Sequence, residues 1–399
     1  MTRRALACSM ALLACGTEAA GAAPELPLGP RTLDERRSSA QLTSAVRWTR
    51  IVREGGPWRL NVLSIAPGTR VKVAPGGAAV GVRARPSSLA RRLASVAAVN
   101  GGYFAADGNP AGVLAAAGAL LSEPVGGRSA LALGADRRRV AALRFTGAAT
   151  VGGVTRLLDG VNRRLGLVPA CGGRGGDRPT ERPDAATVCT DASELVMFTP
   201  SWGTRAPVAD FHVSVRDGAV TAPGSSTIPR DGFVLAASGA AAPLLRSTAA
   251  VGAVVEHGLG LEAPIGPLKP AELAEVVGGG PRLLTGGRVS VRAKAEGFSP
   301  LSAPWFYGSF VAARLPRTLA GVRSDGTLLL VTVDGRRAGW SAGVTLTEAA
   351  RVMRALGARD ALNLDGGGSS SMTVRGRVVS RPSDPGGERP VSDALVVLP

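Results

Sequence analysis

Residues 363–372 (NLDGGGSSSM) are the segment of this sequence that most constrains its fold. An aspartate ends a short apolar run, and three glycines and three serines follow it directly. Glycine loses more conformational entropy on folding than other residues and packs no side chain, so this triplet is costly in a purely structural strand. We therefore expect the backbone after Asp365 to turn sharply and to approach a ligand closely.

Two other apolar runs end in glycines in the same way. Residues 96–104 read VAAVNGGYF and residues 276–284 read VVGGGPRLL. Short helices are expected just before the strands at residues 96 and 276, around residues 87–93 and from Pro270. A helix, a strand and a glycine turn thus recur, which predicts that three glycine turns converge on one cleft.

Composition favours a globular protein and argues against a nucleic-acid ligand. The 399 residues are 45% hydrophobic and 19% charged, enough to bury a full core in one or two domains. The net charge is +17, but the basic residues are scattered and aromatic residues, at 4%, are too few to alternate with them as stacking platforms. Attraction to anionic wall polymers or phosphorylated substrates is the better interpretation.

Residues 1–22 have the pattern of an export signal. Arg3 and Arg4 precede an apolar core, and Ala20-Gly21-Ala22 offers a cleavage point. Residues 12–16 also resemble a lipobox in which Cys15 would carry a lipid, and the two routes stay open. No other run reaches the roughly 18 apolar residues of a membrane span. We expect a polar linker at 23–45 and a secreted, periplasmic or cell-surface protein, lipid-anchored if Cys15 is modified.

The cysteines agree with an exported protein. Apart from Cys8 and Cys15 in the signal region, the sequence holds Cys171 and Cys189. In an oxidising compartment these two are expected to form a disulfide that closes a Gly-, Pro- and Arg-rich surface excursion.

The hydrophobic pattern predicts an α/β (mixed α+β) fold, with a strand-rich mixed sheet and flanking helices. Residues 46–95 form an N-terminal strand-rich part. Thr345 and Glu348 make a capping box that begins a helix ending at Gly357. Strands at 328–333 and 361–364 flank that helix, so parallel strands would bring Asp334 and Asp365 to one edge of the sheet.

Six motifs together resemble the phosphodiester glycosidase domain. This family includes the uncovering enzyme, which removes N-acetylglucosamine from a phosphodiester, and exported bacterial proteins associated with exopolysaccharide. The resemblance assigns residues 96–399 to that domain. The motifs are Asn100-Gly101-Gly102-Tyr103-Phe104, Gly279-Gly280-Pro281-Arg282-Leu283, Pro316-Arg317-Thr318, Thr332-Val333-Asp334-Gly335-Arg336, residues 363–371, and residues 383–392.

Arginines in these motifs are candidates for binding the phosphate group. A planar guanidinium matches two phosphate oxygens and stays charged at any working pH. Arg317, Arg336 and Arg389 are the first candidates and Arg282 is a weaker fourth. Most other arginines are expected on the solvated surface.

Three carboxylates are candidates for catalysis. Asp365 and Asp334 are expected to act as base or nucleophile at the anomeric carbon and as its partner, in an order that the sequence leaves open. The structural alternative is that an aspartate before glycine caps a turn, and it carries nearly equal weight for Asp334. Glu388 is either a catalytic carboxylate or the residue that orients Arg389.

Further polar groups are expected around the ligand. Asn100 and Gly101 would bind sugar hydroxyls or phosphate, while Gly366, Gly367, Ser369 and Ser370 would donate to phosphate as an anion nest. The alternative is that Asn100 serves as a turn residue and that the serines close the turn.

The expected function is hydrolysis of a sugar-1-phosphodiester at the anomeric carbon, in a polysaccharide, wall polymer or glycolipid. No cofactor is required, although Mg²⁺ or Ca²⁺ can be held by oxygen ligands alone. The phosphorylated carbohydrate is the one partner expected. Two alternatives are a non-catalytic envelope protein that binds a phosphopolymer and a phosphodiesterase that cuts the P–O bond, which normally calls for a metal centre.

Overall fold

The structure is a computed structural model that describes residues 25–30, 33–125, 127–134, 137–166, 168–169, 178–179, 188–264, 266–268, 274–298 and 304–399. The expected signal peptide with Cys15, the Pro270 helix and Cys171 lie outside these residues. Only the backbone of Cys189 is described, in β16 (Val188–Thr190), so the predicted disulfide also lies outside them. Among the described helices, none has the length and apolar character needed to span a membrane.

The fold is mostly β, which corrects the expected α/β class. Strands make up 42% and helices 10% of the structure. Among the registered strand pairs of the described chain, β13 with β17 is the single parallel pair. Most of the short apolar runs are joined by tight turns, which connect antiparallel neighbours, whereas a parallel pair requires a long crossover. The helix–strand alternation expected from the sequence is found at α3 and, more briefly, at α1.

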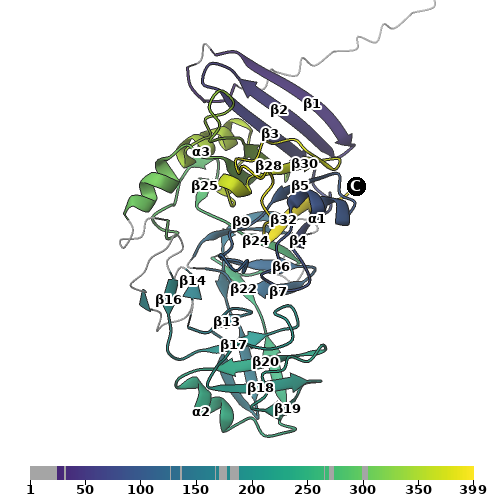
Figure 1. Ribbon diagram of the computed structural model, residues 1–399, viewed down its shortest axis with the longest axis vertical. Coiled ribbons are helices and arrows are strands. Elements are labelled where there is room, and N and C mark those ends of the chain that lie inside the picture. The colour runs from purple at the N-terminus through teal and green to yellow at the C-terminus, as the bar shows by residue number, and fades with distance from the viewer. Residues whose placement is uncertain are drawn as a thin grey trace, which may run out of the picture.

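An eight-stranded sheet forms the upper part of the molecule (Figure 1). Its strands are, in spatial order, β1 (Glu35–Thr43), β2 (Val46–Arg53), β3 (Trp58–Ile65), β28 (Leu328–Val333), β27 (Arg317–Val322), β29 (Asp360–Asn363), β25 (Arg282–Thr285) and β26 (Arg288–Val289). Residues 35–43 were expected to belong to a linker. They instead pair with β2 along their whole length and form the edge of the sheet.

The central strands of this sheet are buried on both faces, which explains the continuous apolar run of β28. On one face Leu329 and Val331 pack against Leu346, Ala350 and Met353 of α3 (Leu346–Ala355). On the other face β28 packs against a five-stranded sheet, in spatial order β31 (Arg377–Val378), β30 (Met372–Val374), β5 (Ala97–Asn100), β32 (Asp393–Val397) and β4 (Val71–Pro75).

A third sheet extends the same core. It consists of β7 (Ala119–Ser122), β6 (Leu114–Ala116), β24 (Glu275–Gly278), β8 (Ser129–Leu133) and β9 (Arg138–Ala142). Because β5, β24 and β29 belong to three different sheets, the three glycine turns that follow them come from three separate layers of the fold.

Residues between β9 and β24 build the lower part of the molecule in Figure 1. Its largest sheet has β13 (Gly160–Val161), β17 (Leu195–Phe198), β20 (Gly232–Ala237), β18 (Phe211–Arg216) and β19 (Ala219–Pro223), covered by α2 (Ala241–Arg246). Three smaller sheets complete it: β12 (Val154–Leu157), β11 (Ala148–Val151) and β21 (Val255–Gly258); β10 (Arg144–Phe145), β22 (Leu261–Ala263) and β23 (Gly266–Pro267); β14 (Val168–Pro169), β16 and β15 (Arg178–Pro179).

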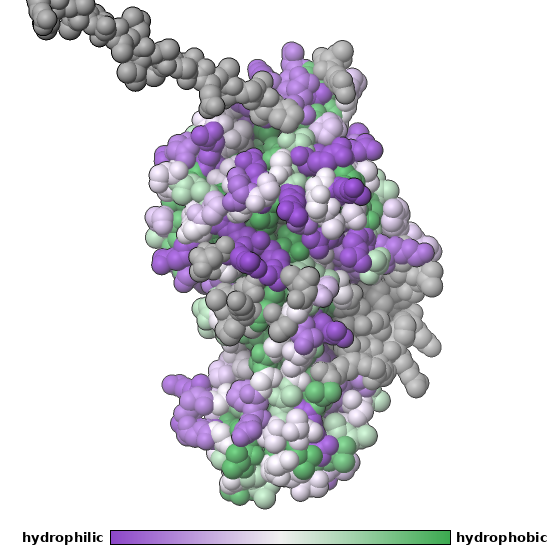
Figure 2. Space-filling view, turned by 180° about the vertical axis from the view of Figure 1, so that it is seen from behind, coloured by the Kyte–Doolittle hydropathy of each residue, from purple (hydrophilic) through white to green (hydrophobic). Residues whose placement is uncertain are grey.

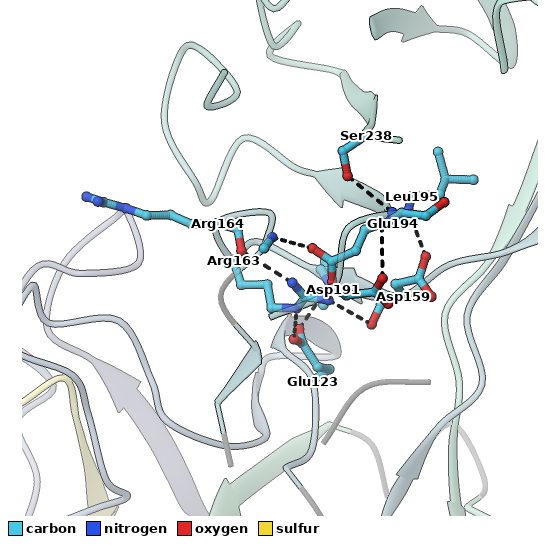
Figure 3. Close-up of polar contacts among 11 residues, drawn as sticks. Glu123, Asp159, Arg163, Arg164, Asp191, Glu194, Leu195 and Ser238 are labelled. Atoms are coloured by element: carbon cyan, nitrogen blue, oxygen red, sulfur yellow. Dashed lines mark hydrogen bonds and ion pairs between the residues drawn. The ribbon is translucent and has the colours of Figure 1, made fainter. Parts of the chain in front are cut away.

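A buried ion network holds this lower part to the rest of the chain (Figure 3). Arg163, just after β13, pairs with Glu194, just before β17, and its Nε lies 2.6 Å from Oε1 of Glu123, just after β7. Burial raises the pKa of Glu123, and the charge of Arg163 opposes that rise. Removing one partner would leave an unpaired buried charge, so the network has a structural role.

Two predicted helices are confirmed where the sequence places them. Helix α1 spans Pro86–Arg92, and α3 begins after Thr345, whose Oγ1 accepts from the Glu348 N–H at 3.1 Å while Glu348 Oε2 accepts from the Thr345 N–H at 2.9 Å. Strand β27 is antiparallel to both β28 and β29, so these two strands run in the same direction. Asp334 and Asp365 therefore follow strands that end at the same edge of the sheet, as predicted.

Replacing the capping residue of α3 tests this account of the helix. Thr345→Ala removes one hydrogen bond of the capping box and is expected to lower the free energy of unfolding by about 1 kcal/mol, measured by urea denaturation. Thr347→Ala, at an exposed position two residues further on, is the matched control and should change it by less than about 0.5 kcal/mol. Equal effects of the two substitutions would contradict the capping role.

Candidate functional site

The three glycine turns meet at one place. The Asp365 N–H donates to the Gly101 carbonyl oxygen at 3.1 Å, and the Gly280 N–H donates to the Asn363 carbonyl oxygen at 2.7 Å. A Cβ on Gly102 would lie 2.8 Å from the Gly278 carbonyl oxygen. The predicted convergence of the turns is therefore present in the backbone.

Buried amide and phenol groups hold these turns together. Asn363 Nδ2 donates to the Tyr103 hydroxyl at 2.6 Å, and that hydroxyl donates to the Gly280 carbonyl oxygen at 2.6 Å. Burial raises the pKa of Tyr103 far above its usual value, so the phenol stays protonated. Asn100 joins the turns in the same way, because its Nδ2 donates to the Asp365 carbonyl oxygen at 2.8 Å and its Oδ1 accepts from Thr318 at 2.6 Å.

Each glycine of the triplet lies against an arginine from a different segment. A Cβ on Gly366 would lie 3.8 Å from Cδ of Arg317, and one on Gly367 would lie 3.3 Å from Nη1 of Arg336. A Cβ on Gly368 would lie 2.2 Å from Nη2 of Arg389 and 2.0 Å from Oδ1 of Asp384. Any larger residue at position 368 would displace the Arg389–Asp384 pair. Gly367 and Gly368 therefore leave room for Arg336 and Arg389 at this turn, whereas a Cβ on Gly366 would first meet the Pro316 carbonyl oxygen, at 3.0 Å.

Arg317 is fully buried and has no carboxylate partner within ion-pair distance among the described residues. Its Nε donates to the Val344 carbonyl oxygen at 3.2 Å, and its Nη2 donates to the carbonyl oxygens of Phe310 and Ala313. Its Nη1 has no hydrogen-bond partner. Burial lowers the pKa of Arg317 to about 10, so the group is charged at neutral pH. A buried cation with a free donor is a site prepared for an anion.

The other two arginines are exposed. Arg336 adopts a left-handed backbone conformation, with φ at 54°, and its positive charge also lowers the pKa of Arg317. Arg389 is held by a two-point ion pair, with Nε 2.7 Å from Oδ2 and Nη2 2.9 Å from Oδ1 of Asp384. The fourth candidate, Arg282, pairs with Asp360 at 2.7 Å instead, so its guanidinium is committed to another contact.

Asp365 is the titratable carboxyl at this turn. Its Oδ1 accepts from the Gly366 N–H at 2.9 Å. Burial raises the pKa of Asp365 to about 6, against the opposing effects of the Ser369 hydroxyl, the Gly366 amide and the charge of Arg389. The carboxyl is therefore largely ionised at neutral pH and becomes protonated in mild acid. This range suits a group that exchanges protons during a reaction.

Asp334 has the contacts of a structural residue. Its Oδ2 accepts from Nε1 of Trp340 at 2.9 Å, and its Oδ1 accepts from the Arg381 N–H at 3.0 Å. Burial raises its pKa, and these two hydrogen bonds oppose the rise. Both oxygens are engaged in holding loops, which favours the turn-capping alternative over a role in catalysis.

Glu388 likewise connects segments. Its Oε1 accepts from the Ser87 N–H at 3.0 Å, at the start of α1, and from the Ser371 hydroxyl at 2.7 Å. It thus holds the end of the serine run rather than Arg389. Ser369 and Ser370 are buried. The Ser369 hydroxyl lies close enough to Asp365 to lower its pKa, and among the described residues the Ser370 hydroxyl has no hydrogen-bond partner and can donate to a ligand.

Asp393 is a site residue that sequence reasoning missed. It is buried, its Oδ1 accepts from the Gly102 N–H at 3.0 Å, and its Oδ2 accepts from the Ser392 hydroxyl at 2.6 Å. Its charge raises the pKa of Asp365. The available signal was its position, directly after the last recognised motif and at the start of the apolar run DALVV.

Among the described residues, no group of three or more His, Cys, Asp and Glu side chains is arranged to hold a metal ion. The expectation that Mg²⁺ or Ca²⁺ can bind here stays a prediction.

Comparison with known families confirms the resemblance. Residues 209–398 match the family described as phosphodiester glycosidase. That range is shorter than the predicted 96–399 and leaves the turn at Asn100 outside the match.

Two known proteins are similar to short stretches of the chain. One is the SPbeta prophage-derived uncharacterized protein YomE of Bacillus subtilis, 44% identical over 82 residues. The other is the mouse N-acetylglucosamine-1-phosphodiester alpha-N-acetylglucosaminidase, 36% identical over 78 residues. These alignments cover 21% and 20% of this chain, and 12% and 15% of the two relatives.

Solved structures share the fold over most of the chain. A candidate exported protein of Burkholderia pseudomallei has a TM-score of 0.82 and 28% identity, with 94% of this chain and 98% of that chain covered. A hypothetical protein from Synechocystis has a TM-score of 0.70 and 24% identity, with 91% and 63% covered, and shows the fold alone.

The role of the glycine triplet is open to a direct test. Gly368→Ala places a methyl group on the Arg389–Asp384 pair and is expected to weaken binding of inorganic phosphate about tenfold in calorimetry, since charge-assisted contacts are lost. Gly386→Ala, in the loop that carries Asp384 and Arg389, is the matched control, because a Cβ there meets nothing within 4 Å. The account is wrong if both variants bind phosphate as the unaltered protein does while their melting temperatures stay equal.

The raised pKa of Asp365 carries a cost in stability above pH 6. The folded protein holds a proton on Asp365 that the unfolded chain releases near pH 4, so stability falls as the pH rises from about 4 to about 6. Asp365→Asn removes this effect. We expect this variant to exceed the unaltered protein by about 2–3 kcal/mol in free energy of unfolding at pH 7.5 and to match it below pH 4. A variant less stable at both pH values would contradict the assigned shift.

Proposed function

We propose that this chain, whose residues 209–398 match the phosphodiester glycosidase family, is an exported hydrolase that cleaves a sugar-1-phosphodiester at the anomeric carbon. The observation that carries the proposal is the grouping of Asp365 with three arginines at one glycine turn. The family match supports phosphodiester glycosidase activity in general. The substrate and the bond that is cleaved are proposed from the geometry of the site.

The geometry suits a phosphate leaving group. When the sugar C1–O bond breaks, its electron pair passes to the phosphate oxygen. A phosphate monoester leaving group needs less help from a general acid than the alcohol that leaves an ordinary glycoside. We assign Nη1 of Arg317, with the exposed forks of Arg336 and Arg389, to the phosphate oxygens. The fixed positive charges stabilise the departing phosphate more strongly than the bound diester, since negative charge grows as the bond breaks.

Asp365 is assigned the attack on the anomeric carbon. Its carboxylate, ionised above pH 6, either bonds directly to C1 or removes a proton from the attacking water. Asp393 raises its pKa and fixes the Gly101–Gly102 turn through the Gly102 N–H, so it acts as a positioning residue. Ser369 and Ser370 are assigned to hydrogen bonds with substrate oxygens.

Export and a polymeric substrate complete the proposal. The N-terminal signal pattern, with Arg3 and Arg4 before an apolar core, supports transport out of the cytoplasm, and the related Burkholderia pseudomallei protein is a candidate exported protein. We propose a secreted, periplasmic or cell-surface location, where the substrate would be a polysaccharide, wall polymer or glycolipid that contains glycosyl phosphate.

Hydrolysis of UDP-N-acetylglucosamine and other sugar-1-phosphodiesters in oxygen-18 water tests the proposal. Cleavage at C1 leaves the phosphate product without label, which phosphorus NMR detects. Asp365→Asn is expected to lower kcat/KM about 10³-fold and Arg317→Lys about 10²-fold. Arg282→Lys is the control and should stay within about threefold, because its partner is Asp360. In the unaltered enzyme kcat/KM should rise through an apparent pKa of about 6.

Each alternative function gives a different result. Label on the phosphate product would indicate a phosphodiesterase. Binding of every panel member without turnover would indicate a non-catalytic carbohydrate-binding protein. Activity that falls as the pH rises through 6 would contradict the role of Asp365 as base or nucleophile.

A further inference from the structure

A second cluster of arginines surrounds Trp340, on the loop that follows Asp334. The guanidinium carbons of Arg59, Arg381 and Arg50 lie 4.1, 4.8 and 5.9 Å from the centre of the Trp340 ring. These arginines come from β3, from the segment after β31 and from β2. We call the four residues the Trp340 patch. Figure 2 shows hydrophilic side chains gathered over the upper part of the molecule, the end that holds the eight-stranded sheet.

The patch is held in a fixed geometry by Asp334. One oxygen of this carboxylate binds the Trp340 ring nitrogen and the other binds the Arg381 amide. Arg59 Nε also donates to the Trp340 carbonyl oxygen at 3.2 Å. Asp334 is therefore a positioning residue for this surface. A preformed arrangement lowers the entropic cost of binding a ligand.

The positive charge of the patch is compensated only in part. The Asp334 carboxylate lies close enough to Arg50 and Arg59 for their charges to lower its pKa. Arg59 lies 4.0 Å from Glu54, which pairs more closely with Arg36 at 2.8 Å. Arg50 and Arg381 form no ion pair with a carboxylate among the described residues. A hollow of about 290 Å³ adjoins the patch, and no carboxylate lines it. Its lining residues are Arg36, Arg37, Ser38, Arg50, Val52 and Arg59.

The loop that carries Trp340 also reaches the candidate active site. Arg336, on the same loop as Trp340, lies against Gly367 of the glycine triplet. Arg337 connects this loop to the segment that carries Arg381, because its Nη2 donates to the Pro382 carbonyl oxygen at 2.9 Å. One loop thus connects the glycine turn with the Trp340 patch, and Arg50 and Arg59 of the patch also line the hollow beside β2.

We infer that the Trp340 patch binds phosphate groups of an anionic carbohydrate polymer, on repeat units beyond the one held at Asp365. The inference rests on the proposed function, since it extends the same substrate. Guanidinium groups match phosphate oxygens, and several of them at fixed positions suit a chain with repeated phosphates. Guanidinium groups already lie over the Trp340 ring, which leaves it poorly placed to stack on a nucleic-acid base, so a carbohydrate backbone is favoured.

Binding of a defined polymer tests the inference without relying on turnover. The probe is poly(N-acetylglucosamine 1-phosphate), compared with the monomer UDP-N-acetylglucosamine, and binding is measured by calorimetry in the Asp365→Asn background. Arg50→Gln with Arg59→Gln is expected to lower the ratio of polymer affinity to monomer affinity about tenfold. The slope of log affinity against log salt should fall by about 2. Arg230→Gln with Arg288→Gln, two exposed arginines outside the patch, is the control of equal charge.

Three results would overturn the inference. The first is polymer binding that the patch variant leaves unchanged. The second is an equal loss in the control pair, which would indicate attraction by net charge alone. The third is a single-stranded DNA of equal charge that competes as well as the polymer does, which would indicate a nucleic-acid surface. Failure of the proposed function is distinguishable, because the unaltered protein would then bind the polymer through the patch and release no sugar.

Discussion

The guanidinium groups of Arg336 and Arg389 approach Gly367 and Gly368 closely because these residues have no side chains, and Arg317 lies in contact with Gly366. Arg317 comes from a buried strand, Arg336 from the loop after β28 and Arg389 from the C-terminal segment. The fold brings these segments together by stacking antiparallel sheets, so that β5, β24 and β29 end at one point. The glycine triplet thus leaves room for the arginines at the turn, and the stacked sheets bring the three segments together. Both are needed to form one anion site.

Arg317 and Asp365 place charge where the fold excludes water. Arg317 keeps a free Nη1 in a buried setting, and Asp365 has a pKa about two units above its usual value. Both features destabilise the empty protein, because desolvated charges lose their hydration. A phosphate bound between the arginines would satisfy the free donor. We interpret this loss of stability in the empty protein as the source of the site's preference for an anion. The tight packing of α3 against β28 keeps the protein folded despite that loss.

Sequence reasoning predicted the local features of the fold better than its class. Short-range patterns predict the capping box at Thr345 and the meeting of the glycine turns. One crossover predicts that Asp334 and Asp365 lie at a common edge of the sheet. The mostly β architecture was missed, because the predicted class gave most weight to the helix–strand units, whereas most of the short apolar runs are joined by tight turns, which connect antiparallel neighbours. For Asp334 the sequence leaves a catalytic and a turn-capping role open. Its contacts with Trp340 and Arg381, which favour the second role, form only when segments distant in sequence pack together.

The location of phosphate relative to Arg317 tests the central claim most directly. A crystal structure with a non-hydrolysable sugar-1-phosphonate would measure it. The account predicts phosphonate oxygens within hydrogen-bond distance of Arg317 Nη1, with the sugar C1 beside the Asp365 carboxylate. Phosphonate bound elsewhere, with Nη1 paired to a protein group, would contradict the claim that the glycine triplet exists to form an anion site.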